Sequence, residues 1–292
     1  MQLFQELTSC SGGYESIWVN HILPVGTTAY LSKFVTRKPY VVFLHGMDFD
    51  LARRNTWKRF LTRRILKGAK RVVTNSYALA REVQAFVRIQ EPIVVHPSVA
   101  DVFVRASHAT PLVSNQSTIT LLTVSRLVER KGHIKVLEAI RDIPNVQYII
   151  VGDGPYYGKI FYRIKDLQLE TRVRIIRSAS DEELPRIYQS ADIFVMPTEK
   201  REFDREGFGI VYLEAQLFGL PVIASDHPGI DEAIVDKVTG FLIEEDQLTL
   251  RKAIIRLVND RKLRERMGSF GRDYVLAGFT REKQFSKLKE LL

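Results

Sequence analysis

Short apolar runs rich in β-branched residues alternate along the chain with stretches in which apolar residues recur every three or four positions. The runs are continuously apolar, as parallel strands are when helices cover both faces of their sheet. The stretches between them have the period of amphipathic helices, for example at 134–140, 210–218 and 248–258. This alternation predicts an α/β fold with doubly wound parallel sheets. The predicted strands cover residues 40–44, 71–74, 92–95, 119–124, 146–151, 173–176, 192–196, 221–224 and 241–243.

Residues 107–118 interrupt this alternation and read SHATPLVSNQST. The segment holds Ser, Thr, Asn and Pro and no charged side chain, which is typical of a linker. Two domains also agree with the length of 292 residues, since a domain averages about 150 residues. We predict an N-terminal domain over 1–106, a linker over 107–118, a C-terminal domain over 119–276 and a C-terminal helix over 277–292.

Composition and charge narrow the class of protein. Apolar residues make up 45% of the chain and charged residues 26%, which is ordinary for a globular protein and excludes a disordered one. A single cysteine, Cys10, excludes an intrachain disulfide and a cysteine-based zinc site, and it favours a reducing, cytoplasmic location. The net charge of +9 favours anionic partners such as phosphates, nucleic acid or an acidic membrane surface.

The segment Glu206-Gly207-Phe208-Gly209, followed by a predicted helix that contains Glu214, carries the strongest chemical pattern. The first turn of a helix has unpaired N–H groups and the positive end of the helix dipole, so it can bind an anion. Glycine lets the backbone approach a ligand closely. The two glutamates can accept hydrogen bonds from hydroxyl groups. The alternative is that they are surface residues that the helix dipole stabilises.

Three further segments follow predicted strands, at the sheet edge where open α/β sheets bind ligands. Two fixed cations in the first of these segments suit a diphosphate group. Each residue alone is equally compatible with a solvated turn or a local hydrogen bond. The residues are Arg126 and Lys131 after 119–124, Gly152 and Asp153 after 146–151, and His45 after 40–44.

Together these motifs resemble those of the retaining glycosyltransferases of GT-B fold in glycosyltransferase family 4 (glycosyl transferases group 1). Glu206 and Glu214 match the two glutamates of that family, with seven residues between them. Residues 239–242 (TGFL) also resemble a late strand of the family. The resemblance implies two Rossmann-like domains that face a cleft. The N-terminal one lies on the acceptor side and is partial, and the C-terminal one binds a nucleotide sugar.

The resemblance also implies an activity. The expected enzyme is a hexosyltransferase that transfers a sugar from a UDP-, GDP- or ADP-sugar to a carbohydrate or lipid-linked acceptor. The transfer is expected to retain the anomeric configuration and to need neither a metal nor another cofactor. Preorganised cations and helix N-termini stabilise the charge of a departing diphosphate, which is the work a metal ion does in other enzymes.

The family pattern assigns a role to each matching residue. Arg126 and Lys131 are expected to contact the donor diphosphate, and the Gly207–Gly209 turn is expected to offer it backbone N–H groups. Glu206 is expected to bind hydroxyl groups of the transferred sugar, and Glu214 those of the ribose.

Two further roles and one turn complete the expected site. His45 is expected to face the reacting sugar, and the donor base is expected near Arg177 and Ser178. Gly152 and Asp153 belong to the donor-binding turn.

The sequence departs from the family pattern in several places. The chain enters the pattern only at about residues 15–21, so it is a fragment, a reduced enzyme, or an enzyme completed by a partner. The family favours glycine where Arg177 stands, which is expected to alter donor choice. Asp48 and Asp50 form an Asp-x-Asp that other transferases use to hold a metal, but here the pattern expects a helix-capping acid.

Residues 53–71 hold nine basic residues, and no acidic residue occurs from 51 to 81. At helical spacing, an apolar arc lies opposite a cationic arc, which predicts an amphipathic helix packed on the N-terminal sheet. We expect the cationic face to contact anionic lipid headgroups at the inner face of the membrane. Nucleic acid is not the expected partner, because the aromatic residues lie on the arc predicted to be packed. The apolar arc contains Trp57, Phe60, Leu61 and Ile65, and the cationic arc contains Arg59, Arg63, Lys67 and Lys70.

Three other functions agree with these residues. The first is a non-catalytic or incomplete GT-B subunit that binds a nucleotide sugar and needs a partner. The second is another GT-B enzyme, such as a sugar-nucleotide epimerase or a phosphorylase. The third is a basic module that binds membranes or nucleic acid and in which the glutamates have no role.

Overall fold

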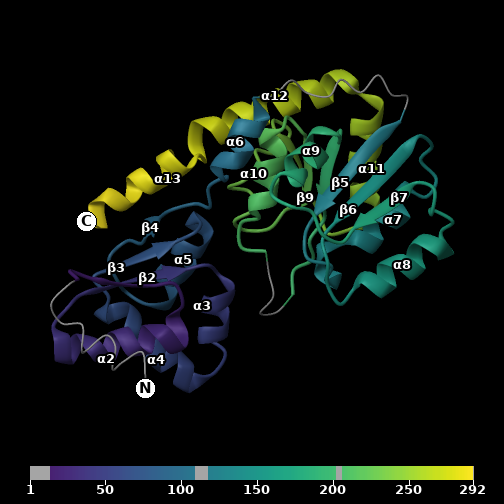
Figure 1. Ribbon diagram of the computed structural model, residues 1–292. Helices are drawn as coiled ribbons and strands as arrows, with labels where there is room; N and C mark the ends of the chain where they lie inside the picture. Colours follow the sequence, from purple (N-terminus) through teal and green to yellow (C-terminus); the bar gives the residue numbers. More distant parts are fainter. Residues whose placement is uncertain (1–13, 109–117, 202–205, 292) are drawn as a thin grey trace. The chain divides into compact units, whose positions relative to one another are not determined.

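The computed structural model describes residues 14–108, 118–201 and 206–291 (Figure 1). Contacts divide them into two compact units. The N-terminal unit contains the described residues up to Pro97 together with 206–208 and 284–291, and the C-terminal unit contains the rest. The division after Pro97 precedes the predicted domain end at residue 106, and the predicted linker residues 109–117 lie outside the described residues.

The N-terminal unit is built on a four-stranded parallel sheet with the order β1-β2-β3-β4. The edge strand β1 was not among the predicted strands because its apolar run is only three residues long. The strands are β1 (Ile17–Val19), β2 (Tyr40–Leu44), β3 (Arg71–Thr74) and β4 (Ile93–Val94). The helical elements are η1 (Ile22–Gly26), α2 (Thr27–Thr36), α3 (Met47–Ala52), α4 (Thr56–Gly68) and α5 (Tyr77–Phe86).

The two faces of this sheet are covered by different parts of the chain. On one face, Tyr40, Val42 and Leu44 of β2 are buried against residues that include Ile65 of α4 and Val83 of α5. On the other face, Val41 and Val73 are buried with Leu288 and Leu291 from the end of the chain. The predicted C-terminal helix is here divided into α13 (Arg281–Ser286) and the short helix η3 (Lys287–Leu291).

The C-terminal unit is built on a six-stranded parallel sheet with the order β10-β9-β8-β5-β6-β7. Figure 1 labels β9, β5, β6 and β7 of this sheet. Its strands are β5 (Ile119–Val124), β6 (Val146–Val151), β7 (Val173–Ile176), β8 (Ile193–Met196), β9 (Val222–Ser225) and β10 (Gly240–Ile243). Its helices are α6 (Asp101–Ser107), η2 (Glu129–Lys131), α7 (His133–Ile140), α8 (Tyr157–Asp166), α9 (Glu183–Gln189), α10 (Ile210–Leu217), α11 (Gln247–Asn259) and α12 (Arg261–Gly278). The predicted α/β class with parallel sheets is confirmed.

The register of the C-terminal sheet aligns the ends of the strands that carry the motifs. Val124 of β5 pairs with Val151 of β6, and Val151 pairs with Ile176 of β7. The first residue of each following loop therefore lies in one row. Backbone hydrogen bonds continue the ladder there, from Ser125 N to Val151 O at 3.0 Å and from Gly152 N to Ile176 O at 2.9 Å.

The packing of α4 differs from the prediction. Ile65 is fully buried and Leu61 is half-buried, as expected for its apolar arc. Trp57 is 69% exposed and Phe60 is 49% exposed, so the expectation that both pack on the sheet was wrong. The side chains of Thr62 and Leu66 are buried in their place, because the buried face of α4 lies further round the helix. Within the part of the chain that is described, no helix is long and apolar enough to cross a bilayer.

Candidate functional site

Lys131 is held at the carboxyl end of the C-terminal sheet by close packing. The following residue, Gly132, has a φ of +72°, and a Cβ atom placed on it lies 2.2 Å from the carbonyl oxygen of Pro197. Only glycine therefore permits this approach. The side chain of Lys131 is buried, and its Nζ lies 3.5 Å from Sδ of Met196, the last residue of β8. Arg126 lies in the same loop and is exposed.

A chain of buried polar groups lies beneath this loop. The ring of His133 contacts Ser125 Oγ at 3.1 Å through Nε2, and the Tyr148 hydroxyl at 3.4 Å through Nδ1. The Tyr148 hydroxyl in turn lies 2.7 Å from Oγ1 of Thr123. Burial lowers the pKa of His133 to about 4, and the nearby charge of Lys131 acts in the same direction, so the ring is neutral at pH 7.

Asp153 and Arg177 form an exposed ion pair across the ends of β6 and β7. Arg177 Nη2 lies 2.7 Å from Asp153 Oδ2, and its Nε lies 3.2 Å from Oδ1. The guanidinium also lies 4.8 Å from the ring centre of Tyr157. The hydrogen bonds to Asp153 raise the pKa of Arg177, and those from Arg177 lower the pKa of Asp153. Ser178 follows directly and is exposed.

The start of α10 lies beside the same strand end as Lys131. Gly209 precedes the helix with a φ of +80°, and a Cβ atom there lies 2.4 Å from Cε2 of Tyr212. The Tyr212 hydroxyl donates to the carbonyl oxygen of Met196 at 3.1 Å. Met196 therefore contacts Lys131 and, through the Tyr212 hydroxyl, the first turn of α10, so both candidate anion-binding groups lie at the carboxyl end of β8.

Glu214 lies one turn further into α10 and is half-buried. Burial raises the pKa of its carboxyl group, although a hydrogen bond from the Tyr188 hydroxyl to Oε2 at 2.8 Å acts in the opposite direction. The charge of Asp181 raises the pKa further. The ring of Tyr188 is fixed by stacking on Phe218 at 5.5 Å between ring centres. The carboxylate of Glu214 is therefore oriented by a rigid neighbour.

The turn after Glu206 lies against the loop that contains His45, and both belong to the N-terminal unit. Glu206 is half-buried and His45 is exposed. A Cβ atom placed on Gly207 lies 2.9 Å from the carbonyl oxygen of His45, so the two backbones are in contact. Asn75 Nδ2 donates to the same carbonyl at 3.1 Å. The glycine-rich turn and the loop after β2 are thus in backbone contact at His45.

Phe208 is buried in the N-terminal unit beside His96. The two rings lie 5.3 Å apart, and the His96 ring lies 5.5 Å from that of Tyr77. The backbone N–H of His96 donates to Oε1 of Gln284 at 2.9 Å. The last helical segment thus supports the residue that packs against the glycine-rich turn.

The Asp-x-Asp does not form a joint metal site. The Asp48 carboxylate accepts from the backbone N–H of His45 at 2.9 Å, in the first turn of α3. Asp50 pairs instead with Arg53. Across residues 14–108, 118–201 and 206–291, no group of three or more His, Cys, Asp or Glu side chains is arranged to hold a metal ion.

The predicted site residues fall into two groups, one in each unit. Sequence analysis missed three residues that support them. Asn75 and His96 each follow the end of a strand by one or two residues. The preference of open α/β sheets for binding ligands at the carboxyl ends of their strands, which selected His45, therefore also points to them. Tyr188 gave no signal, because its contact with Glu214 joins residues 26 positions apart. The C-terminal group contains Arg126, Lys131, Gly152, Asp153, Arg177, Ser178, Gly209 and Glu214, and the N-terminal group contains His45, Glu206, Gly207 and Phe208.

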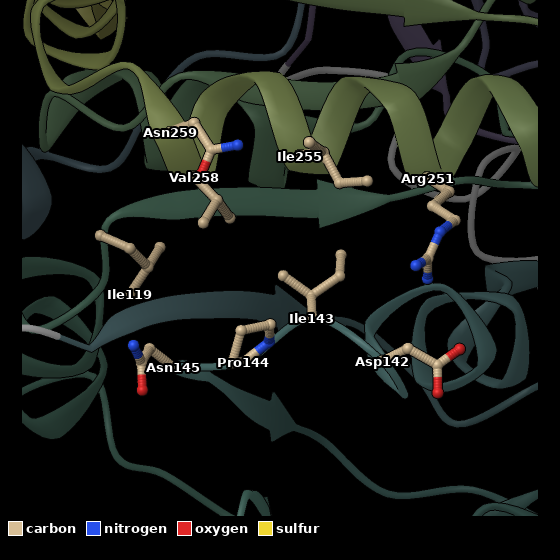
Figure 2. A pocket seen from close by; sticks show the side chains of 9 residues that line it. All are labelled: Ile119, Asp142, Ile143, Pro144, Asn145, Arg251, Ile255, Val258 and Asn259. Carbon is tan, nitrogen blue, oxygen red and sulfur yellow. The ribbon is translucent and has the colours of Figure 1, made fainter.

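The hollow in Figure 2 lies at the opposite edge of the C-terminal sheet. Its volume is about 440 Å³. It is lined by Ile119 at the start of β5, by Asn145 just before β6 and by residues of α11 that include Ile255 and Arg251. It is therefore separate from the motif-bearing carboxyl ends of the strands.

Two family patterns match the chain. The pattern described as "Glycosyl transferases group 1" matches residues 104–274, and that described as "Glycosyltransferase Family 4" matches residues 5–102. Together they cover both units.

Curated relatives point to the same family. A GDP-mannose-dependent alpha-(1-6)-phosphatidylinositol monomannoside mannosyltransferase of Mycolicibacterium smegmatis is 35% identical over 59% of this chain, and the chain spans about half (47%) of that relative. A GDP-mannose-dependent monoacylated alpha-(1-6)-phosphatidylinositol monomannoside mannosyltransferase of Corynebacterium glutamicum is 28% identical over 95% of this chain and 76% of its own length.

Solved structures share the fold. Anabaena Alr3699/HepE in complex with UDP matches 99% of this chain and 81% of its own chain, with a TM-score of 0.87 and 21% identity. The sucrose-phosphate synthase of Thermosynechococcus elongatus matches 99% of this chain and 78% of its own, with a TM-score of 0.81 and 23% identity. The two parallel-sheet units thus have the GT-B fold, and the chain belongs to the glycosyl transferases group 1 family.

Proposed function

We propose that the protein is a retaining glycosyltransferase that transfers a sugar from a nucleoside diphosphate sugar to a carbohydrate or lipid-linked acceptor without a metal ion. The observation that carries this proposal is that Lys131 and Tyr212, in the first turn of α10, both contact Met196 at the carboxyl end of β8. A buried cation and a helix N-terminus beside one strand end are suited to a diphosphate.

The chemistry requires stabilisation of a leaving group. When the bond between the anomeric carbon and the phosphate oxygen breaks, the electron pair and negative charge remain on the nucleoside diphosphate. Arg126, Lys131 and the N–H groups at the start of α10 stabilise that charge. Lys131 and the start of α10 do so without reorganisation, because their positions are set by packing. Glu206 is expected to bind hydroxyl groups of the transferred sugar, and His45 is expected to face the reacting sugar.

The donor nucleotide is held by the remaining residues. Glu214, oriented by Tyr188, accepts hydrogen bonds from the ribose hydroxyl groups. The Gly152-Asp153 turn follows β6, and the loop at Arg177 and Ser178 follows the neighbouring strand β7. Both contact the base. The relatives named as GDP-mannose-dependent and the fold relative solved with UDP support a donor of the UDP- or GDP-sugar class.

Release of nucleoside diphosphate from a panel of UDP-, GDP- and ADP-sugars tests the proposal. We expect release from one donor, and loss of that release in Glu206→Gln with an unchanged unfolding temperature. Near-normal turnover of Glu206→Gln would refute the assignment. Binding without turnover would indicate a non-catalytic subunit, a free epimerised sugar would indicate an epimerase, and dependence on phosphate would indicate a phosphorylase.

Nucleotide binding tests the phosphate site separately. A hydrogen bond to a charged group contributes about 1.5–3 kcal/mol, so Arg126→Ala and Lys131→Ala should each weaken nucleoside diphosphate binding about ten- to a hundredfold. Arg141→Ala is the matched control. Arg141 is exposed at the C-terminal end of α7, away from the carboxyl ends of the strands where the proposed phosphate site lies. Unchanged affinity in both site variants would remove the phosphate site.

A lipid-linked acceptor requires access to a membrane. The cationic helix α4 carries five basic residues and no acid, so it is suited to an anionic cytoplasmic membrane surface, with the protein bound there peripherally.

A further inference from the structure

Asn75 lies directly beside His45 at the carboxyl edge of the N-terminal sheet. Strands β2 and β3 are paired with Leu44 opposite Thr74, so His45 and Asn75 are the first residues after the paired ends of neighbouring strands. Asn75 has little freedom, because the residue before it ends β3 and the side chain of Ser76 after it caps α5. The Asn75 side chain therefore projects from a fixed point of the backbone.

Two side chains hold the backbone of His45. Nδ2 of Asn75 donates to the His45 carbonyl oxygen at 3.1 Å, and Oδ1 of Asp48 accepts from the His45 N–H at 2.9 Å. Both backbone polar groups of His45 are thus paired, although the residue lies beyond the end of the strand. The following residue, Gly46, has a φ of +102°, a conformation that favours glycine. These contacts fix the direction in which the His45 side chain leaves the backbone.

The hydrogen bond from Asn75 to His45 forms part of the surface against which the glycine-rich turn packs. A Cβ atom placed on Gly207 would lie 2.9 Å from the His45 carbonyl oxygen and 3.4 Å from Nδ2 of Asn75. Glycine at this position therefore lets the turn approach the carbonyl group that Asn75 holds. A displaced carbonyl would either push the turn away or leave a gap beneath it.

The next residue, Phe208, anchors the turn at the end of β4. Its side chain is 2% exposed, and its ring lies 5.3 Å from that of His96, which follows β4 by two residues. The backbone N–H of His96 donates to Oε1 of the buried Gln284 at 2.9 Å. The turn is therefore held at two strand ends of the N-terminal unit, and Glu206 directly before it belongs to the same compact unit as His45.

The other polar atom of the Asn75 side chain has no partner. Oδ1 is buried, and no hydrogen-bond donor among the described residues reaches it. A buried amide oxygen without a partner destabilises a folded protein, whereas an apolar side chain of similar shape does not. Stability alone therefore does not favour asparagine here, and the contribution of the residue is the hydrogen bond that Nδ2 donates to His45.

We propose that Asn75 is a positioning residue for the transfer reaction. By holding the His45 carbonyl group, it fixes the His45 ring and, through the packing of Gly207, the turn that carries Glu206, so that both side chains reach one transferred sugar. The inference rests on the proposed function, which places His45 and Glu206 at that sugar. Displacement of such groups by about 1 Å lowers turnover about a hundredfold, even when the change that causes it does not touch the substrate.

Asn75→Leu tests this role, because leucine has nearly the shape of asparagine but neither donates a hydrogen bond nor leaves an unpaired oxygen. We expect kcat for donor-dependent release of nucleoside diphosphate to fall about tenfold or more. The affinity for nucleoside diphosphate should stay nearly unchanged, since Arg126, Lys131 and the start of α10 lie in the C-terminal unit. The free energy of unfolding should be unchanged or higher. A loss of diphosphate affinity or of stability that matches the fall in kcat would indicate a purely structural role and overturn the proposal.

Two further variants make the result specific. Asn75→Asp keeps the shape and removes the donor, so it should also lower kcat, and normal turnover in this variant would overturn the proposal. Asn259→Leu is the matched control, and it should leave kcat unchanged. Asn259 is exposed at the end of α11, beside the hollow of Figure 2 and away from the motif-bearing strand ends. An equal loss of kcat in the control would overturn the assignment to Asn75.

Combination with His45→Ala tests whether Asn75 acts through His45. Once the ring is absent, Asn75→Leu has less left to displace. The double variant should therefore lose less than the product of the two single losses, because residues that act as a unit are not additive. Losses that multiply would overturn the proposal.

A measurement without substrate follows the His45 ring directly. The chain contains six histidines, and His45→Gln identifies the ring signal of His45 in nuclear magnetic resonance spectra of protein that contains carbon-13-labelled histidine. Asn75→Leu should shift that signal and leave the signal of His133, in the C-terminal unit, unchanged. An unshifted His45 signal would overturn the proposal.

The role of Asn75 and the proposed function can fail separately. If the unsubstituted protein releases nucleoside diphosphate from no donor, the proposed function is refuted, and a shifted His45 signal in Asn75→Leu still supports the placement of His45 by Asn75. Release that Asn75→Leu leaves unchanged would refute the role of Asn75 alone.

Discussion

Gly132→Ala tests whether packing against Pro197 holds the proposed phosphate-binding loop in place. A left-handed backbone costs a non-glycine residue about 1–2 kcal/mol, and the reduced freedom of the unfolded chain offsets about 0.4–1 kcal/mol of that. The Cβ atom would also lie 2.2 Å from the Pro197 carbonyl oxygen. Overpacking of this kind adds about 1–3 kcal/mol, so we expect a total loss of about 2–4 kcal/mol.

Gly219→Ala provides the matched control in the same unit. Gly219 has a φ of +76°, nearly that of Gly132, and a Cβ atom there meets nothing within 4 Å. It should therefore cost about 0–1.6 kcal/mol, from backbone strain less the offset in the unfolded chain. The difference between the two variants isolates the contact with Pro197.

Urea unfolding followed by circular dichroism measures both free energies of unfolding, and an unchanged slope confirms that the unfolded states are comparable. Gly132→Ala should also weaken nucleoside diphosphate binding, because the adjacent Lys131 shifts with the loop, whereas Gly219→Ala should not. Equal destabilisation of the two variants, or unchanged nucleotide affinity in Gly132→Ala, would refute the reasoning.

Three further predictions concern the titratable groups of the C-terminal unit. Tyr188→Phe removes the hydrogen bond that lowers the pKa of Glu214, so the carboxylate should be protonated earlier when the pH is lowered. On acidification, donor binding should therefore be lost at a higher pH than in the unsubstituted protein. Calorimetric titrations across pH measure this, and an unshifted profile would contradict it. Arg177→Gly removes a guanidinium that can stack on a purine base, and it leaves Asp153 without its ion-pair partner. GDP and ADP should therefore bind about tenfold more weakly relative to UDP. An unchanged preference among the three bases would contradict a role of Arg177 in base recognition. The unfolded chain binds a proton at His133 near pH 6.5 and the folded chain only near pH 4, so stability should fall by about 3 kcal/mol as the pH drops through that window. His133→Gln should flatten this part of the unfolding profile, and an unchanged profile would contradict the assignment.

The sequence predicts strands more reliably than it predicts packing partners. The strand from 119 to 124 is almost continuously apolar because both of its faces are buried. Its position, and that of the loop after it, therefore follow from the pattern of apolar residues alone. The same rule locates Arg126 and Lys131. The exposure of Trp57 and Phe60 does not follow from their spacing. Helical spacing shows which residues share one face of a helix, but it does not show which face packs against the rest of the protein.

Contacts between distant residues were not predictable either. Gln284 supports His96 across 188 positions, and Tyr188 orients Glu214 from another helix. Neither pair has a periodic pattern or motif. The pattern that selects the two candidate glutamates is, by contrast, local: their spacing and the glycines beside Glu206 can be read directly from the sequence.

The covering of the N-terminal sheet by the end of the chain has a consequence for biosynthesis. Val41 and Val73 are buried by Leu288 and Leu291, which are synthesised more than 200 residues later. At about 5–20 residues per second, the roughly 190 residues after Pro97 take about 10–40 s to synthesise. During that time one apolar face of a nascent parallel sheet lies bare. We therefore expect the nascent N-terminal unit to be more prone to aggregation until residues 288 and 291 are synthesised and dock on this face.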